Sequence, residues 1–376
     1  MKLRCERDTL VEALSATGRA AVVSAGRGST IGAVHLSLSG DDLQLTSNDG
    51  DLTIRVEIVV AGSEDGACLL PSRLTGDIVR ALEPGAVVVE NDDEEAHISA
   101  GRSQFGVRLL PELDFPRMPA SEGTPVDLGT SDFAEALHQV VRAASTDEAR
   151  PTLNGVLLAA QPQGLRMVAT DSYRLAERTL LGRTVLAQGQ EVSVPARALV
   201  ELQRLASATS GPACKIAGDS TERELSFSVG EYYATFHVGD VTLTTTLLRD
   251  FPNVARLFSQ SFPNQLSVGK EPLLEAIRRV RLLARDATSW LHVSLEPDQI
   301  QLMATDQERG HASEDVDAKY DGEEMTMQFN PAYLIDGVDG VCGDEVLIEI
   351  EGPSKPVMVH ASTNDPYRYL LAPRSV

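Results

Sequence analysis

The sequence predicts an α+β fold of three repeated domains, each with two helices packed on antiparallel strands. An alternating strand that ends in a polar turn occurs three times, at Leu43–Asp49, Leu165–Leu175 and Ile300–Asp306. The turns are roughly 120 to 135 residues apart, which is the length of a domain. This periodicity indicates one domain repeated three times along the chain.

A second marker keeps the same spacing. Pro71, Pro195 and Pro331 each follow an apolar segment and are expected at the first position of a helix. Two separate markers in one register make a chance match a poor explanation. Pro111–Gly123 and Arg249–Asn264 have the composition of linkers. The expected domains are therefore residues 1–123, 124–249 and 250–376.

The first domain begins with a helix that Asp8 can cap and that places Leu10, Ala13 and Leu14 on one face. The elements expected after it are strands at Ala33–Leu38, Leu43–Thr46 and Leu52–Val59, a helix at Arg73–Leu82, and strands at Val87–Glu90, His97–Ala100 and Gln104–Leu109.

The other two domains repeat this order. The second has a helix capped by Thr130-Ser131-Asp132, strands at residues 155–158 and 165–170, and a helix that follows Val192–Pro195. The third has a helix with Leu273, Ile277, Val280 and Ala284 on one face, strands at Leu291–Leu295 and Ile300–Ala304, and a helix opened by Thr326–Pro331.

The composition is that of an ordinary globular protein, with 376 residues, 42% hydrophobic and 23% charged. The apolar runs are too short to cross a membrane, and the charged N-terminus does not fit a secretory signal, so we expect a cytoplasmic protein. The four cysteines, Cys5, Cys68, Cys214 and Cys342, lack C-x-x-C spacing and are expected to be reduced and mostly buried.

The net charge of −22 argues against a nucleic-acid partner only if the charges are evenly mixed. Acidic residues gather at Asp92–Glu95 and Glu314–Asp317, which we expect in strand-end loops. Arginines gather on predicted helices: Arg73 with Arg80, Arg197 with Arg204, Arg142 near His138, and Arg278, Arg281 and Arg285 as a stripe. One such helix would be an ordinary solvated face, but the repetition favours a shared basic surface that contacts phosphates without sequence preference.

No catalytic motif was found: G-x-x-x-x-G-K-[ST], H-E-x-x-H, G-x-S-x-G and a G-x-G-x-x-G behind a strand are missing. Asp49, Asp171 and Asp306 could suggest a metal site of three carboxylates. Because they occupy equivalent positions in separate repeats, we expect each to cap backbone N–H groups of its own turn. We therefore expect neither an enzyme nor a cofactor.

Several motifs together resemble the beta subunit of bacterial DNA polymerase III, the sliding clamp family. They are T-L-N-G-V-L-L at 152–158, V-A-T-D-S-Y-R-L-A at 168–176, V-S-V-P-A-R-A-L at 192–199, D-F-P-N at 250–253, F-N-P-A-Y-L at 329–334, S-K-P-V at 354–357 and Y-L-L-A-P at 369–373. The resemblance covers essentially the whole chain. It implies clamp-type domains that assemble as a head-to-tail homodimeric ring around duplex DNA, with helices lining the hole. Such a ring is a processivity factor of DNA replication that slides along the nucleoid's DNA.

The resemblance also implies site residues. A groove between the second and third domains would bind short linear peptides of the replicative polymerase, the clamp loader, repair polymerases and ligase-type proteins. Its residues would be Leu153, Thr170, Ser172, Tyr173, Arg174, Leu175, Pro252, Arg256, Leu257, Ser354, Pro356, Leu370, Leu371, Ala372, Pro373 and Arg374, with Arg174 and Arg256 as donors. The DNA-facing residues would be Arg27, Arg73, Arg80, Arg142, Arg150, Arg197, Arg204, Arg278, Arg281 and Arg285, and the dimer would meet at Phe105, Leu282 and Leu283.

Two residues depart from the family pattern at the groove. Ala372 stands where methionine is common, and Arg374 where an apolar residue is usual. This altered wall raises the hypothesis of a second, variant clamp that tolerates a clamp-targeting antibiotic. Two other classes are a protein interaction scaffold that does not enclose DNA, and a metal-dependent nuclease, which lacks further ligands at metal spacing. Retention on circular but not on linear DNA separates the clamp from the scaffold.

Overall fold

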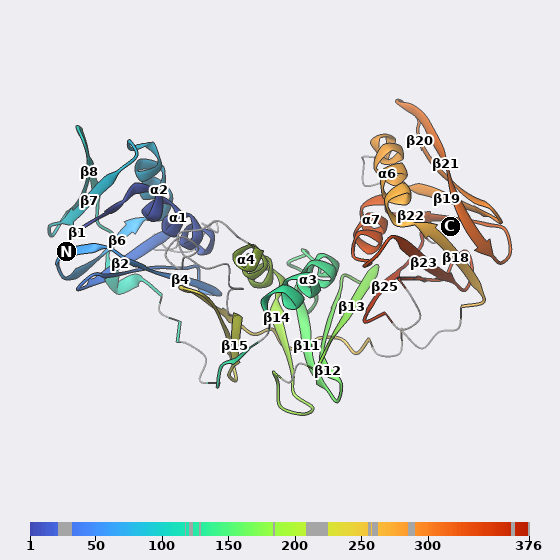
Figure 1. Ribbon diagram of the computed structural model, residues 1–376, viewed down its shortest axis with the longest axis horizontal. Helices are drawn as coiled ribbons and strands as arrows, with labels where there is room; N and C mark the ends of the chain where they lie inside the picture. Colours follow the sequence, from blue (N-terminus) through green and yellow to red (C-terminus); the bar gives the residue numbers. More distant parts are fainter. Residues whose placement is uncertain are drawn as a thin grey trace. The chain divides into compact units, whose positions relative to one another are not determined.

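The computed structural model describes the chain except for residues 22–31, 117, 120–122, 128, 183–184, 208–224, 255–256, 258–261, 285–289, 362–364 and 375–376. The described residues form two compact units. One comprises Met1–Ser131 and Ala198–Leu247, and the other comprises Asp132–Arg197 and Leu248–Val376. The middle third of the chain therefore contributes to both units (Figure 1).

Each third of the chain contains the same pattern twice: a strand, a helix, then three strands. The first third has β1 (Lys2–Glu6), α1 (Arg7–Thr17), η1 (Gly18–Ala20), β2 (Ala33–Ser39), β3 (Asp42–Asn48), β4 (Leu52–Val59), β5 (Ala61–Glu64), β6 (Gly66–Pro71), α2 (Ser72–Ala81), β7 (Ala86–Asn91), β8 (Glu95–Ala100), β9 (Ser103–Arg108) and η2 (Glu112–Asp114). Here β5 is an addition to the pattern.

The second third has β10 (Val126–Asp127), α3 (Thr130–Val140), η3 (Val141–Ala143), η4 (Pro151–Leu153), β11 (Gly155–Gln161), β12 (Gly164–Thr170), β13 (Arg174–Leu181), β14 (Glu191–Pro195), α4 (Ala196–Ser207), β15 (Leu225–Val229), β16 (Tyr233–Val238) and β17 (Val241–Thr246). The last third has β18 (Asn264–Gly269), α6 (Lys270–Val280), η6 (Arg281–Leu283), β19 (Leu291–Glu296), β20 (Gln299–Asp306), β21 (Gly310–Asp321), β22 (Met325–Phe329), α7 (Pro331–Asp339), β23 (Glu345–Ile350), β24 (Val357–His360) and β25 (Tyr367–Leu371). The prediction of three repeated α+β domains is confirmed.

The strands form three antiparallel sheets. Their orders are β5-β1-β7-β8-β9, β10-β15-β16-β17-β4-β3-β2-β6 and β14-β11-β12-β13-β25-β24-β23-β18-β21-β20-β19-β22. Two pairings join strands from different thirds of the chain: β17 with β4 in one unit, and β13 with β25 in the other. Each of these four strands is the third strand after a helix. The two pairings between thirds of the chain, which we call seams, therefore follow one rule: a third strand pairs with a third strand.

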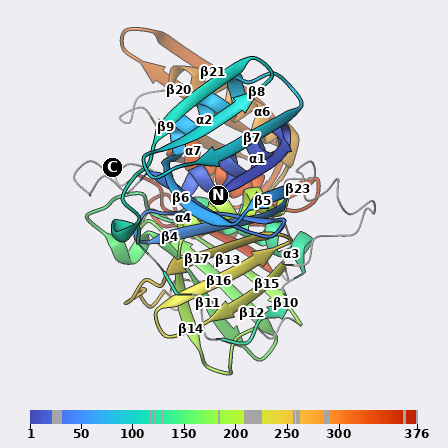
Figure 2. The same cartoon turned by 90° about the vertical axis from the view of Figure 1, so that its left-hand side faces the viewer.

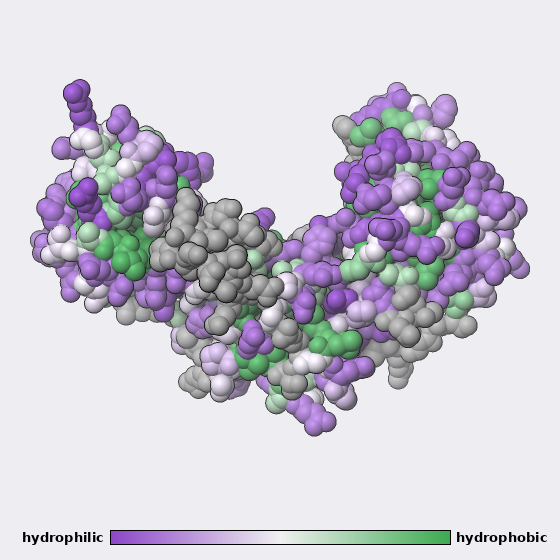
Figure 3. Space-filling model, viewed as in Figure 1, coloured by the Kyte–Doolittle hydropathy of each residue, from purple (hydrophilic) through white to green (hydrophobic). Residues whose placement is uncertain are grey.

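The helices cover the sheets with apolar faces. In the first third, α1 contacts β3 and β4, and α2 contacts β2 and β6, while β7 and β8 pass over both helices in Figure 2. Helix α6 buries Leu273, Ile277 and Val280, three of the four residues predicted on its face, and Ala284, just beyond the helix, is buried too. The visible surface is mainly hydrophilic, with hydrophobic residues in small separate patches (Figure 3). None of the described helices has the length and hydrophobicity needed to cross a membrane.

Some expected element boundaries were wrong by a residue or two. Asp8 lies in the first turn of α1, where Glu6 is the N-cap residue, and its carboxylate pairs with Arg7. Pro71 and Pro195 end their strands, and only Pro331 occupies the first turn of its helix. In the first third, β1 and β5 were not predicted, because β1 alternates Leu3 and Cys5 with charged residues and β5 buries no residue. In the other two thirds, β10, β13, β15 to β18, β21 and β23 to β25 were not predicted.

One further expectation fails for a physical reason. The acidic run Glu314–Asp317 lies within β21 rather than in a loop, because Val316, Ala318 and Tyr320 alternate as the buried face of that strand. Cys342 is exposed, and its thiol donates to the carboxylate of Glu135 at 2.7 Å. Burial and the neighbouring carboxylate of Glu135 raise the pKa of the Cys342 thiol.

Cys5 and Cys68 are buried as expected, and Cys214 lies outside the described residues. Burial raises the pKa of the Cys5 and Cys68 thiols to about 12. These two thiols therefore behave as small apolar core groups.

Candidate functional site

An apolar groove of about 670 Å³ lies in the second unit, where the β12–β13 turn, η4, the chain after β17 and the end of β25 meet. Eleven of the predicted groove residues line it: Leu153, Thr170, Ser172, Tyr173, Arg174, Leu175, Pro252, Leu257, Pro356, Leu370 and Ala372. The lining residues not predicted for the groove are Ala149, Arg150, Pro151, Thr152 and Val254. Most of these residues flank the T-L-N-G and D-F-P-N motifs, and this proximity is the sequence signal that could have identified them.

The β13–β25 seam builds the groove from segments far apart in the sequence. Leu175 lies opposite Leu370 and Arg174 opposite Leu371, and the Ala372 N–H donates to the Tyr173 carbonyl at 2.9 Å. Beneath them Leu175 and Leu370 share a buried cluster with Val168, Val254 and Met358. The floor of the groove is thus part of a core, while Tyr173 and Leu257 at its mouth are 59% and 45% exposed.

The turn at the groove is held by Asp171. One oxygen of its carboxylate accepts the N–H groups of Tyr173 and Arg174 at 2.9 and 3.0 Å, and Ser172 between them has a φ of 80°. A positive φ is strained for a residue with a Cβ. The two hydrogen bonds of the Asp171 carboxylate stabilise the turn in this conformation.

The other two aspartates of the repeat act in the same way. Asp49 accepts the N–H groups two and three residues later at 3.0 and 2.9 Å, and Asp306 does so at 2.9 and 2.8 Å. The expectation that these aspartates cap their own turns is confirmed. In the part of the chain that the structure describes, no group of three or more His, Cys, Asp or Glu side chains is arranged to hold a metal ion.

Arg174 lines the groove, and its guanidinium is engaged by other residues of the chain. Its Nε donates to Asp171 at 3.0 Å, its Nη1 donates to Asp336 of α7 at 2.5 Å, and its Cζ lies 4.1 Å from the centre of the Tyr333 ring. Two of its donors are thus taken within the chain, and donation by Arg174 to a partner stays a prediction. The side chain ties the turn to helix α7.

Arg150 is a second arginine that lines the groove. We had assigned it to the DNA-facing surface, but it lines the groove, where its Nε pairs with Asp147 at 3.0 Å and its Nη1 donates to the Ser172 hydroxyl at 3.3 Å. Its side chain is 41% exposed. Arg150 therefore places an accessible guanidinium at the mouth of the groove.

Four predicted groove residues do not line the cavity. Leu371 is fully buried on the other face of β25, because successive strand residues point to opposite faces. Ser354 and Pro373 lie outside the lining. Arg374 lies over the Trp290 ring, with its Cζ 5.1 Å from the ring centre. Arg256 lies outside the described residues.

The arginines predicted to face DNA are mostly on exposed helix surfaces. Arg73, Arg80, Arg142, Arg197, Arg204, Arg278 and Arg281 are exposed, and Arg27 and Arg285 lie outside the described residues. Arg142 pairs with Asp339 at 2.8 Å and contacts His138. Burial lowers the pKa of His138, and the Arg142 charge adds to this. At the candidate dimer surface, Phe105 and Leu282 are 39% and 54% exposed, and Leu283 is half-buried.

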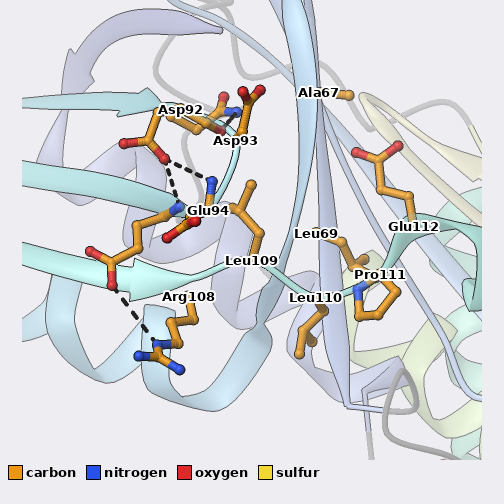
Figure 4. A pocket seen from close by; sticks show the side chains of 12 residues that line it. Ala67, Leu69, Asp92, Asp93, Glu94, Arg108, Leu109, Leu110, Pro111 and Glu112 are labelled. Atoms are coloured by element: carbon orange, nitrogen blue, oxygen red, sulfur yellow. Dashed lines mark hydrogen bonds and ion pairs between the residues drawn. The ribbon is translucent and has the colours of Figure 1, made fainter.

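The predicted acidic loop Asp92–Glu95 borders a second hollow, of about 660 Å³, with Leu69, Leu109 and Leu110 on its other side (Figure 4). One Asp92 carboxylate oxygen accepts the N–H groups of Glu94 and Glu95, both at 2.8 Å. These bonds, with a third from His97, lower the pKa of Asp92 to about 2. The Asp92 carboxylate thus accepts hydrogen bonds within its own turn.

Comparison with known proteins gives the same family over the whole chain. Models of the DNA polymerase III beta subunit match residues 1–119 (N-terminal domain), 127–253 (central domain) and 255–375 (C-terminal domain). The beta sliding clamps of Synechococcus elongatus and Streptomyces coelicolor are 31% and 29% identical, each over 99% of both chains. The crystal structure of the Caulobacter crescentus beta sliding clamp, 28% identical, matches with a TM-score of 0.88 over 100% of this chain and 99% of that one. The Bacillus subtilis DNA polymerase sliding clamp, 25% identical, matches with the same TM-score and coverage.

Proposed function

This chain belongs to the DNA polymerase III beta subunit family, the DNA sliding clamps, and we propose that it works as a closed dimeric ring that encircles duplex DNA and holds polymerases there through its groove. The ring has no catalytic role of its own in this proposal and needs no cofactor. It would act in the cytoplasm, on the nucleoid. The three proposed domains are residues 1–123, 124–249 and 250–376.

The observation that carries the ring is the rule of strand pairing. Both seams between thirds of the chain join the third strand of one repeat to the third strand of another, as β4 with β17 and β13 with β25. Two third strands are left over. Strand β9 pairs only with β8, and Gly310–Asp317 of β21 pairs only with β20 among the described strands. The same rule then joins β9 of one copy to β21 of another, head to tail, and two such seams close a dimer.

The charges along the free edges of β9 and β21 support this pairing. Arg108 ends β9 and Arg102 precedes it, whereas β21 presents Asp315 and Asp317 on its exposed face. Phe105 is in β9, and Leu282 follows helix α6, which packs on β21. A seam with an apolar anchor and opposite charges at its ends has the usual composition of a specific interface.

The groove supports the tethering role. An apolar floor made by Leu153, Leu175 and Leu370 suits aliphatic or aromatic anchors of an extended peptide, and Arg150 at the mouth can donate to its backbone or to an acidic side chain. We assign this groove to short linear segments of the replicative polymerase, clamp loader, repair polymerases and ligase-type proteins. Nothing in the comparisons favours the variant-clamp or scaffold alternatives.

The decisive experiment is loading and retention on DNA. The protein is loaded onto nicked circular DNA by a clamp loader with ATP, the free protein is removed, and half of the sample is cut with a restriction enzyme. We expect the protein to remain on the circle and to leave the linear product, because enclosure rather than affinity holds it. Retention after cutting, or no loading at all, would contradict the ring.

A further inference from the structure

The two exposed arginines of helix α2 differ in their surroundings. Arg73 and Arg80 are two helical turns apart on the same side. Arg80 Nη1 pairs with the Asp77 carboxylate at 2.9 Å, three residues earlier in the same helix. Arg73 makes no ion pair with another residue that the structure describes. One arginine of the surface is thus occupied by an acid of its own helix, and the other is not.

The pair of an arginine with an acid three residues earlier recurs on α4, the equivalent helix of the second domain. Arg204 Nη1 pairs with Glu201 at 2.7 Å, again three residues earlier. Asp77 and Glu201 occupy the same place in the repeat, six residues after Pro71 and Pro195 respectively. The other oxygen of Glu201 lies 3.4 Å from Nη1 of Arg19 in η1. The pair is thus common to the first two repeats, whereas Gly337 and Gly340 stand at the corresponding positions after Pro331 in the third.

The Asp77–Arg80 pair is weak, because both groups remain hydrated and screened by salt. In the second pair Arg204 is exposed, whereas the Glu201 side chain is 12% exposed and also contacts Arg19. The Arg80 and Arg204 side chains are 57% and 59% exposed, so a phosphate can reach them. Each guanidinium then has two alternative anions close by, its own carboxylate and a DNA phosphate. When the guanidinium exchanges its carboxylate for a phosphate, or the reverse, it loses one ionic contact and gains another.

We propose that Asp77 and Glu201 compete with DNA phosphates for Arg80 and Arg204, and that this competition keeps the binding of the ring to DNA weak. This rests on the proposed function, which places these helices next to the duplex. A free arginine releases counterions when it binds phosphate and gains affinity, but each gain must be lost again when the protein moves. A ring that is held by enclosure does not need that affinity.

The first test compares the two arginines of α2. Binding of the protein to a short linear duplex is measured over a series of salt concentrations, and the slope of log K against log salt counts the phosphate contacts. Arg73→Gln should lower the magnitude of this slope by about 0.9 for each copy in contact, whereas Arg80→Gln should lower it by less than half as much. Equal losses for the two variants would overturn the proposal.

The second test removes the competing acids. Asp77→Asn with Glu201→Gln should raise the magnitude of the slope by up to about 1.8 per contacting copy and tighten binding at low salt. The matched control is Asp93→Asn with Glu94→Gln, which changes the net charge equally at exposed positions of the β7–β8 turn. The control should leave the slope unchanged. The same slope in both double variants would overturn the proposal.

The third measurement is made on loaded protein. Diffusion along DNA, followed by single-molecule fluorescence, should be slower for the Asp77→Asn and Glu201→Gln double variant than for the Asp93 and Glu94 control. Equal diffusion would also overturn the inference. Failure of the unsubstituted protein to stay on circular DNA would instead contradict the proposed function, so the two failures are distinguishable. If the acid variants fold poorly, the comparison of Arg73→Gln with Arg80→Gln still tests the proposal.

Discussion

Single side chains decide how the turns of this protein close. The same contact, one carboxylate oxygen accepting two backbone N–H groups, recurs at Asp49, Asp171, Asp306 and Asp92. This contact could be predicted from the sequence because it is local: it needs only an aspartate at the end of a strand. The contacts of Arg174 could not, since its partners Asp336 and Tyr333 are far along the chain.

Asp92 gives a pH-dependent prediction at this scale. Its pKa is lowered to about 2 by the N–H groups of Glu95 and Glu94 and by His97, whereas an unfolded aspartate titrates near 3.9. A lowered folded-state pKa contributes stability that is present above about pH 4 and is lost as the pH falls toward 2. Carbon-detected NMR titration of the carboxyl group should therefore give a midpoint near 2. A midpoint near 4 would contradict this assignment, and Asp92→Asn should remove this contribution to acid sensitivity.

At the scale of elements, the close packing of α7 on β25 depends on glycine. A Cβ at Gly337 would lie 2.5 Å from the Tyr369 ring, which is almost fully buried. A Cβ at Gly76, within α2, would have nothing within 4 Å. Both glycines are inside helices, so alanine would gain about 1 kcal/mol of helix propensity at either position. The packing around each glycine then decides the sign of the effect.

We expect Gly337→Ala to lower the free energy of unfolding by about 1 to 2 kcal/mol, because the clash with Tyr369 exceeds the gain in propensity. Gly76→Ala should raise it by about 0.5 to 1 kcal/mol. Urea titration of both variants, followed by circular dichroism, checks the pair. Stabilisation by both substitutions would show that α7 can move away from β25 without cost.

The elements themselves were largely predictable, and their contacts were not. Periodicity located both helices of each domain and most strands of the first domain, because alternation and helical spacing are properties of short segments. In the other two domains it located β11, β12, β19 and β20 and missed strands such as β13 and β25. The run Glu314–Asp317 was misassigned because its charges were given more weight than the alternation of Val316, Ala318 and Tyr320. The groove residues came from matched motifs, while Arg150 and Val254 were missed for the groove because only the folded seam brings them to it.

At the scale of the whole molecule, strand pairing is the organising principle. Both seams within the chain use third strands, and β9 and the Gly310–Asp317 part of β21 remain with one edge unpaired among the described strands. Exposed strand edges are a liability for aggregation unless they are covered or charged. Pairing with a second copy covers both edges and leaves the groove, which lies in a single unit, intact in each subunit.

This arrangement separates the effect of the seam from that of the groove. Phe105→Ala removes the aromatic side chain of β9, and we expect it to weaken the dimer by about 2 kcal/mol, roughly 30-fold in Kd. Leu113→Ala is the matched control, because Leu113 is 101% exposed and lies outside the edge strands. Sedimentation equilibrium should detect the weaker dimer only for Phe105→Ala, and this variant should leave circular DNA faster. Affinity for a partner peptide should be unchanged in both variants. An unchanged dimer in Phe105→Ala would rule out the β9–β21 seam, whereas loss of peptide binding would show that the groove depends on the second subunit.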